Sequence, residues 1–266
     1  MQSTTTKGHV IIAGAGPGDA ELITIKLQKK LAIADVIISD RLVNPDIIFL
    51  NAKADVEVII AGKQGFNDAS FSQDEINNLI VLHALKGKTV LRLKGGDVAF
   101  FSNVLDELYS IIENDIPFEI IPGITAAAGA SAYAGIPLTA RGYSQGVQWI
   151  TFNPSTKYQP DKWRYLSATD DTLVFYMASK NVVYLAELLT RYAQKKNTPI
   201  AVVEQATTPH QKVSISTLQN CGVDFKDKVF SSPSLVIVGE VVSLHHQFNW
   251  FKIDDANGSI FKELVK

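Results

Sequence analysis

Short apolar runs alternate with turns and amphipathic stretches along the first half of the chain. Runs of this kind are typical of strands buried on both faces of a parallel sheet. The expected strands cover residues 9–13, 34–38, 56–61, 90–93 and 118–121. The intervening patterns predict helices at residues 22–31, 76–84, 104–113 and 126–134. Strands alternating with helices indicate an α/β fold.

The second half of the chain also predicts strands and helices, and one stretch near its end alternates polar and apolar residues. Strands are expected at residues 147–152, 172–176, 199–203 and 234–242, and an amphipathic helix at 181–194. Residues 211–218 alternate polar and apolar side chains, which favours an exposed antiparallel pair. At 266 residues the chain suits two domains. We therefore expect two α/β domains, covering residues 1–140 and 145–252, and a tail at 253–266.

Composition narrows the function classes. The formal net charge of -2 gives no basic field that would gather nucleic acid. Cys221 is the only cysteine, which excludes an internal disulfide and a cysteine zinc cluster, and the histidines show no metal-ligand spacing, so no metal is expected. His245 and His246 are interpreted as a solvated pair at a strand end. Residues 1–7 carry no apolar segment, so we expect a cytoplasmic protein without a membrane anchor.

A glycine-rich loop, Gly14 to Asp19, follows the first strand. It resembles a dinucleotide fingerprint, but Asp19 occupies the third glycine position and Pro17 has no N–H to point at a phosphate. A carboxylate at a helix start would also repel a pyrophosphate. The loop therefore favours a ligand without phosphates and makes an NAD-dependent dehydrogenase a remote alternative. A tight turn in which Asp19 caps the following helix is also expected.

A second glycine loop, Gly95-Gly96-Asp97, directly follows the strand at residues 90–93. Two glycines allow close backbone approach, and ligands of open α/β sheets bind beyond the carboxyl ends of strands. We therefore expect a small polar ligand here, and the alternative is a simple strand-ending turn.

Charged residues follow the ends of two other expected strands. Asp40 and Arg41 follow residues 34–38, and Lys63 follows residues 56–61. An adjacent aspartate and arginine usually form a local ion pair of little energetic value. Ser72 and Glu75 match a capping box and are interpreted as structural.

Taken in order, these loops resemble the tetrapyrrole methylase family, and most closely its uroporphyrinogen-III C-methyltransferase branch. The resemblance covers nearly the whole chain. It rests on motifs at residues 14–19, 34–42, 94–97 and 122–139, and more weakly on 175–177, 202–207 and 232–239.

The resemblance implies an enzyme that transfers methyl groups from S-adenosyl-L-methionine to carbons of a tetrapyrrole and releases S-adenosyl-L-homocysteine. It also implies that the cofactor lies in a cleft between the two α/β domains. The implied substrate is uroporphyrinogen III, the product is precorrin-2 of the sirohaem and cobalamin pathways, and the implied assembly is a homodimer. Asp40 is implied as a proton acceptor and Lys63 as a proton donor. The implied cofactor contacts are Pro17, Gly95, Gly96, Asp97, Phe100, Thr125, Ala126, Met177 and Ala206.

The chain departs from the branch where a ring rich in carboxylates would need cations. Residues 98–104 lack the proline, the arginine and two glycines usual in the branch, and Thr151-Phe152-Asn153 replaces its Thr-Gly-His. Arg41 and Arg141 are then the first candidates for binding the acid groups. The alternative is a family member with a different tetrapyrrole substrate, or a weakly active tetrapyrrole-binding homologue.

Overall fold

The computed structural model describes residues 6–61, 71–156, 159–193, 195–252 and 258–261. The chain divides into two compact units. The first unit comprises Met1–Ala126 and Ser259–Lys266, and the second comprises Ala127–Gly258. This division places residues 127–140 in the second unit, whereas the sequence-based limit lies at residue 140. Both units are α/β, as the sequence pattern predicts.

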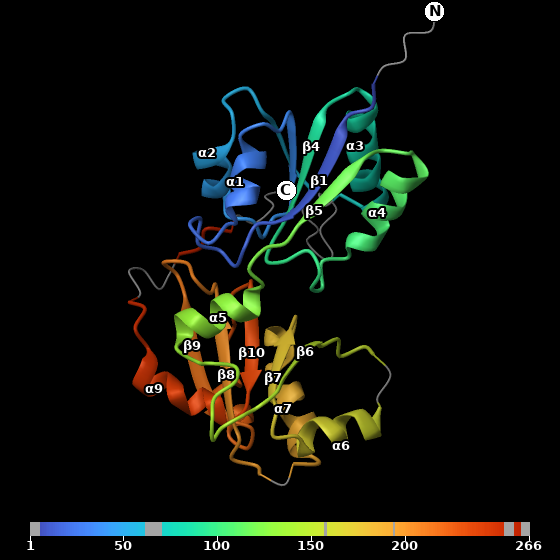
Figure 1. Ribbon diagram of the computed structural model, residues 1–266. Helices are drawn as coiled ribbons and strands as arrows, with labels where there is room; N and C mark the ends of the chain where they lie inside the picture. Colours follow the sequence, from blue (N-terminus) through green and yellow to red (C-terminus); the bar gives the residue numbers. More distant parts are fainter. Residues whose placement is uncertain (1–5, 62–70, 157–158, 194, 253–257, 262–266) are drawn as a thin grey trace, which may run out of the picture. The chain divides into compact units, whose positions relative to one another are not determined.

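The first unit is built on a parallel five-stranded sheet with the order β3-β2-β4-β1-β5 (Figure 1). The register places Gly14 opposite Lys94, so β1 and β4 end side by side at the centre of the sheet. The strands are β1 (His9–Gly14), β2 (Val36–Ser39), β3 (Glu57–Ile60), β4 (Thr89–Lys94) and β5 (Phe118–Ile121). The predicted strands of the first half are therefore confirmed.

The helices of the first unit cover the two faces of its sheet in pairs. α1 (Ile25–Leu31) and α2 (Pro45–Asn51) pack in one apolar cluster, and α3 (Gln73–Leu85) and α4 (Val104–Glu113) pack in the other. The chain therefore leaves β1 toward one face and leaves β4 toward the opposite face. Neighbouring parallel strands whose connections diverge in this way create a topological switch point, where ligands of open α/β sheets bind.

Helix caps in the first unit follow the local sequence, with one correction. Ser72 and Glu75 form the predicted capping box of α3, with the two reciprocal bonds at 2.7 and 3.2 Å. The prediction that Asp19 caps the first helix is wrong, because Thr24 is the N-cap of α1. Asp19 instead accepts a hydrogen bond from the backbone N–H of Glu21 at 2.9 Å. Its short side chain therefore shapes the loop rather than the helix.

The second unit contains a mixed five-stranded sheet with the order β6-β7-β10-β8-β9. Only β6 and β7 pair in parallel, and the remaining neighbours are antiparallel. The strands are β6 (Val147–Thr151), β7 (Thr172–Tyr176), β8 (Pro199–Glu204), β9 (Lys212–Thr217) and β10 (Ser234–Val238). The antiparallel pairing predicted for residues 211–218 is confirmed. The strand predicted at 234–242 is central as expected, but it ends at Val238, because Glu240–Leu244 form a 3₁₀ turn.

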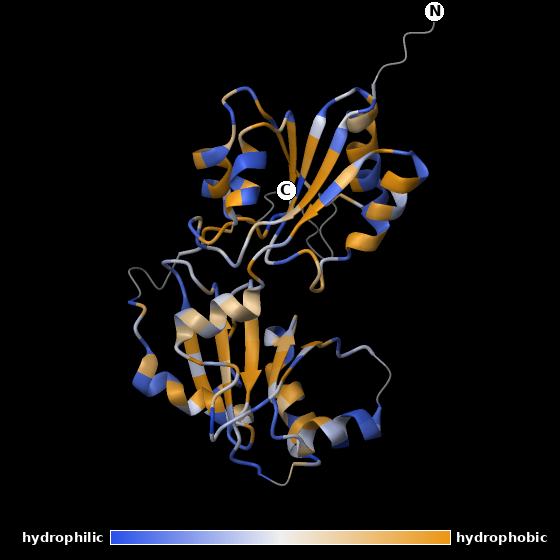
Figure 2. Ribbon diagram, in the orientation of Figure 1, coloured by the Kyte–Doolittle hydropathy of each residue, from blue (hydrophilic) through white to orange (hydrophobic). Residues whose placement is uncertain are grey.

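The helices of the second unit are short. Figure 2 shows strands dominated by hydrophobic residues, and α6 and α7 bury their apolar faces in one large core cluster on the sheet. The helices are α5 (Ala126–Ala134), α6 (Pro160–Ala168), α7 (Val182–Thr190), α8 (Cys221–Asp224) and α9 (His245–Phe248), with 3₁₀ turns η1 (Ser179–Asn181) and η2 (Glu240–Leu244). The interpretation of His245 and His246 as a strand-end pair is wrong, because both lie on α9, where the Nδ1 atom of His245 is 2.6 Å from the carbonyl oxygen of Ala134.

Three further observations bear on the chemistry available to the chain. Among the described residues, no group of three or more His, Cys, Asp or Glu side chains could hold a metal ion. None of the helices within the described ranges is both long and apolar enough to cross a membrane. Burial raises the pKa of the Cys221 thiol to about 11, so this cysteine is a protonated core residue at neutral pH.

Candidate functional site

Three loops meet at the switch point of the first unit. They follow β1, β4 and β5, and the first two join through an isolated antiparallel bridge between Gly16 and Gly96. Gly16 N–H donates to Gly96 O at 3.1 Å, and Gly96 N–H donates to Gly16 O at 2.8 Å. Ala15 N–H donates to the carbonyl of Lys94 at 2.7 Å. The loops after β1 and β4 are therefore fixed to one another by backbone hydrogen bonds.

Glycine is required where these loops touch. A Cβ atom added to Gly14 would lie 2.5 Å from the carbonyl oxygen of Gly96, and one added to Gly123 would lie 2.3 Å from the same oxygen. Gly96 itself has a φ of 67°, in the left-handed region that favours glycine. We name the contact of Gly14, Gly16, Gly96 and Gly123 the glycine junction. A ligand lying against it meets backbone amides and carbonyls rather than side chains.

The Asp97 carboxylate hydrogen-bonds to two of the three loops. One carboxylate oxygen accepts from Ala99 N–H at 2.8 Å, and the other accepts from Gly123 N–H at 2.7 Å. The residue is 6% exposed, so both hydrogen bonds lie in a largely dry environment where charge-assisted bonds are strong. Through these two hydrogen bonds, Asp97 holds the loop after β4 against the loop after β5.

Other residues implied as cofactor contacts lie around the junction. Thr125 and Ala126 approach Gly96 closely, because a Cβ atom added there would be 3.5 Å from Ala126 N and 4.0 Å from Thr125 Cα. Pro17 is buried in the loop after β1. Phe100 follows the Gly-Gly-Asp loop and keeps 39% of its surface exposed. The structure therefore brings Gly96, Thr125 and Ala126 together and leaves the Phe100 ring accessible.

The two implied contacts in the second unit lie at a strained sheet edge. β7 and β8 both run antiparallel to β10, so their carboxyl ends share one edge. Met177 follows β7 with a φ of 60°, and Ala206 follows β8 between Gln205 at 45° and Thr207 at 69°. Such conformations are costly for residues other than glycine and cluster at functional sites. Met177 is also 66% exposed, which is unusual for a large apolar side chain.

The charged candidates fall in different environments. Asp40 pairs with Arg92, not with its neighbour Arg41, so the expectation of a local ion pair is wrong. The Nε atom of Arg41 is buried, and no described residue is its hydrogen-bond partner. Arg141 is exposed in the second unit. Lys63 lies outside the described residues.

Sequence reasoning missed a buried charge cluster beside the junction. Glu107 of α4 accepts from Arg92 Nε at 2.8 Å and from Lys94 Nζ at 2.9 and 3.0 Å. The side chains of Arg92, Lys94 and Glu107 are 2%, 4% and 0% exposed. Burial lowers the pKa of Arg92, but Asp40 and Glu107 outweigh this effect and raise it, so the guanidinium stays charged. The sequence did contain a signal for this cluster: Arg92 and Lys94 are two cations in the otherwise apolar strand β4, and buried cations require a carboxylate partner.

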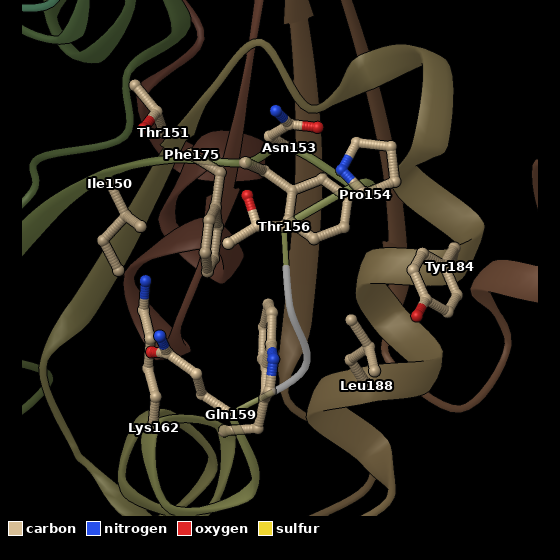
Figure 3. Close-up of a pocket in the computed structure, with 12 residues that line it drawn as sticks. Ile150, Thr151, Asn153, Pro154, Thr156, Gln159, Lys162, Phe175, Tyr184 and Leu188 are labelled. Carbon is tan, nitrogen blue, oxygen red and sulfur yellow. The ribbon is translucent and has the colours of Figure 1, made fainter.

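A small pocket lies within the second unit, at the carboxyl end of β6 (Figure 3). Its lining includes the apolar side chains of Phe175 and Trp163. Asn153, Gln159 and Lys162 supply polar groups. Its volume of about 60 Å³ accommodates one or two water molecules, far below the ~300 Å³ or more of sites for organic ligands. This pocket by itself is therefore too small for a tetrapyrrole.

Comparison with known proteins gives the site its context. Residues 9–221 match the family model of the tetrapyrrole (corrin/porphyrin) methylases. The siroheme synthase of Acinetobacter baylyi is 42% identical over 247 residues, covering 93% of this chain and 54% of that protein. The chain thus spans about half the length of the curated relatives that it matches.

Solved structures agree with this relationship. The native uroporphyrin III C-methyl transferase of Thermus thermophilus matches with a TM-score of 0.74 and 32% identity, covering 89% of this chain and all of that one. The same enzyme complexed with S-adenyl homocysteine matches with a TM-score of 0.72 and 31% identity, covering 88% of this chain and 93% of that one. The family match covers most of the chain, and the chain therefore belongs to the S-adenosylmethionine-dependent tetrapyrrole methylases.

Proposed function

We propose that this chain transfers methyl groups from S-adenosyl-L-methionine to carbons of uroporphyrinogen III, giving precorrin-2 for sirohaem or cobalamin synthesis. The observation that carries the proposal is the glycine junction at the switch point of a chain 32% identical to a uroporphyrin III C-methyl transferase. The homodimer and the cytoplasmic location expected from the sequence remain predictions.

The residues of the first unit suit S-adenosylmethionine. This molecule carries no phosphate, so the missing N–H of Pro17 is no handicap, and its amino, hydroxyl and sulfonium groups suit backbone carbonyls. The backbone of Gly95 and Gly96 can approach a ligand without side-chain obstruction. We infer that the cofactor is bound by the residues that the resemblance implies, which are Pro17, Gly95, Gly96, Asp97, Phe100, Thr125, Ala126, Met177 and Ala206. When bound, the cofactor supplies an electrophilic methyl group.

Methyl transfer is an in-line displacement, so correct positioning of donor and acceptor supplies most of the rate enhancement. Attack by a pyrrole carbon leaves a positive charge on the tetrapyrrole, which is discharged by loss of a proton from another position of the macrocycle, and Asp40 is our candidate acceptor for that proton. One Asp40 oxygen pairs with Arg92, which holds the carboxylate in one orientation at the end of β2. A proton-donor role for Lys63 remains a prediction from the family resemblance.

Arginines are the natural partners of the acid groups of uroporphyrinogen III, because a guanidinium binds a carboxylate with two parallel hydrogen bonds. Arg41 has a buried Nε atom without a partner among the described residues, and an unpaired buried donor is costly. Arg141 is exposed and available. We propose that both bind substrate carboxylates.

The test measures methyl transfer and cofactor binding separately. Purified protein is incubated with S-adenosylmethionine labelled in its methyl group and with uroporphyrinogen III, and label in the tetrapyrrole is counted. Calorimetry with S-adenosyl-L-homocysteine and with NAD reports cofactor choice. Transfer to the tetrapyrrole supports the proposal. Binding of S-adenosyl-L-homocysteine without transfer refutes this substrate, and binding of NAD alone refutes the cofactor as well.

The segment between β4 and α4 favours a second candidate, a different tetrapyrrole substrate or weak activity. It contains no cation, and Phe101 and Asn103 adopt left-handed φ values of 56° and 54°. The side chain of Asn103 donates to Asp106 at 2.8 Å rather than reaching outward. If this segment faces uroporphyrinogen III, Asn103→Arg should lower KM about tenfold, since a charge-assisted bond contributes about 1.5–3 kcal/mol. Asn114→Arg, at the other end of α4, is the matched control and should leave KM unchanged.

A further inference from the structure

Glu107 is a carboxylate with no exposed surface, and it lies at the centre of the charge cluster of the first unit. It comes from α4, whereas both of its cationic partners, Arg92 and Lys94, come from β4. Each partner is bound within 3.0 Å. Removing a charge from water costs several kcal/mol by order of magnitude, so a carboxylate in this position requires the two cations.

Arg92 links this buried centre to the accessible end of β2. Its Nε atom donates to Glu107, and its Nη2 atom donates to Asp40, whose side chain is 30% exposed. Nη1 donates to the carbonyls of Ile38 at 3.2 Å and Leu93 at 3.3 Å. The guanidinium is a rigid plane, so fixing one edge fixes the direction of the other. Glu107 and the two backbone carbonyls together therefore set the direction in which Nη2 faces Asp40.

We propose that Glu107 is a positioning residue for methyl transfer: it holds the Arg92 guanidinium so that Nη2 is presented to the Asp40 carboxylate. The proposal rests on the role of Asp40 as proton acceptor in the proposed function. Glu107 does not contact the reacting atoms.

The charge balance explains why a neutral residue cannot replace Glu107. With Glu107 and Asp40 ionised, two cations face two anions. Glu107→Gln leaves Arg92 and Lys94, two residues apart on one strand, with a single anion at the edge of the cluster. Arg92 then loses the partner that orients its Nε side, and the two cations repel each other in a poorly solvated environment.

The kinetic test is a double-mutant cycle on methyl transfer with the full chain. Asp40→Asn should lower kcat about 100-fold, the scale of general acid–base assistance. Glu107→Gln should lower kcat about tenfold with KM nearly unchanged. In the Asp40→Asn background the same substitution should have almost no further effect on kcat, because Glu107 acts through Asp40. Non-additive losses of this kind identify residues that act through one another. Glu113→Gln, an exposed position on the same helix, is the matched control and should retain wild-type kcat. Equal losses from Glu107→Gln in both backgrounds would overturn the proposal.

A second measurement does not depend on activity. The crystal structure of the Glu107→Gln variant should show the Arg92–Asp40 contact broken or divided between conformers, and an unchanged contact would refute positioning by Glu107. If that variant fails to fold, Arg92→Lys takes its place: it keeps the charge without the fork, and kcat should fall about tenfold, whereas wild-type kcat would count against the proposal. Unchanged kcat in Asp40→Asn would instead refute the acceptor role, while the crystallographic result still decides whether Glu107 positions Arg92.

Discussion

Replacing Gly123 by alanine tests whether the glycine junction is the cofactor site. The new Cβ atom would lie 2.3 Å from Gly96 O and 2.8 Å from the Gly14 carbonyl group, and both neighbours are backbone atoms that cannot turn aside. Overpacking of this kind costs about 1–3 kcal/mol. Weakening the bond from Gly123 N–H to Asp97 costs up to about 1.5–3 kcal/mol more, because the acceptor is charged.

These terms predict a loss of about 1–6 kcal/mol, below the middle of the usual ~5–15 kcal/mol range of total stability, so the variant should fold at 25 °C. Tm should fall by about 10 °C, at ~2–4 °C per kcal/mol for a chain of this length. The three loops must move apart to admit the methyl group, and displacements of this size should weaken binding of S-adenosyl-L-homocysteine at least tenfold, by order of magnitude.

Thermal unfolding and isothermal calorimetry measure the two effects on the same preparation. Gly222→Ala is the control, since its added Cβ atom would meet only a side-chain atom of Val183 at 3.8 Å. That variant should bind like the wild type. If Gly123→Ala binds S-adenosyl-L-homocysteine with unchanged affinity although Tm falls, the junction is structural and the cofactor site lies elsewhere.

Three other perturbations have definite outcomes. Lys30 and Lys26 hold the pKa of Glu119 at about 2, below its ordinary value of 4.5. The stability that this contributes above pH 4.5 should therefore be lost as the pH falls toward 2. In Glu119→Gln, the free energy of unfolding measured with urea should depend less on pH in this range. Burial lowers the pKa of His83 below 6.5, so stability should also decrease as the pH falls below that value, and His83→Gln should remove this dependence in the same assay. Met177→Gly should relieve a left-handed strain of about 1 kcal/mol, raising Tm while weakening the binding of S-adenosyl-L-homocysteine measured by calorimetry.

Much of the fold follows from local pattern, and its exceptions have physical causes. The apolar runs locate the strands because a buried strand needs apolar side chains on both faces. The sequence pattern did not predict α2 and α6, because both helices are short. Each begins with a proline, Pro45 or Pro160, and a proline is as typical of a loop as of a helix start. The antiparallel neighbours of β10 could not be deduced from an apolar run, because parallel and antiparallel central strands have the same composition.

The candidate site was predictable only in part. Each glycine loop is recognisable from its local sequence. The contact of Gly14, Gly96 and Gly123, however, depends on β1 lying between β4 and β5, and the sequence of a loop does not determine the strand order. The partner of Asp40 was assigned to the adjacent Arg41 for the same reason. Arg92 reaches Asp40 because β2 and β4 are neighbours across 52 residues of sequence.

Backbone strain is the observation that supports the predicted cofactor contacts of the second unit, Met177 and Ala206. Met177, Gln205 and Thr207 each carry a side chain in a conformation that glycine would adopt at little cost. All three follow the carboxyl ends of β7 and β8, and Met177 also exposes most of an apolar side chain to water. Strain and exposure are both unfavourable for the isolated unit. We predict that contact with the cofactor offsets both costs at Met177, because strained conformations cluster at binding sites. Unchanged affinity of Met177→Gly for S-adenosyl-L-homocysteine would contradict this prediction.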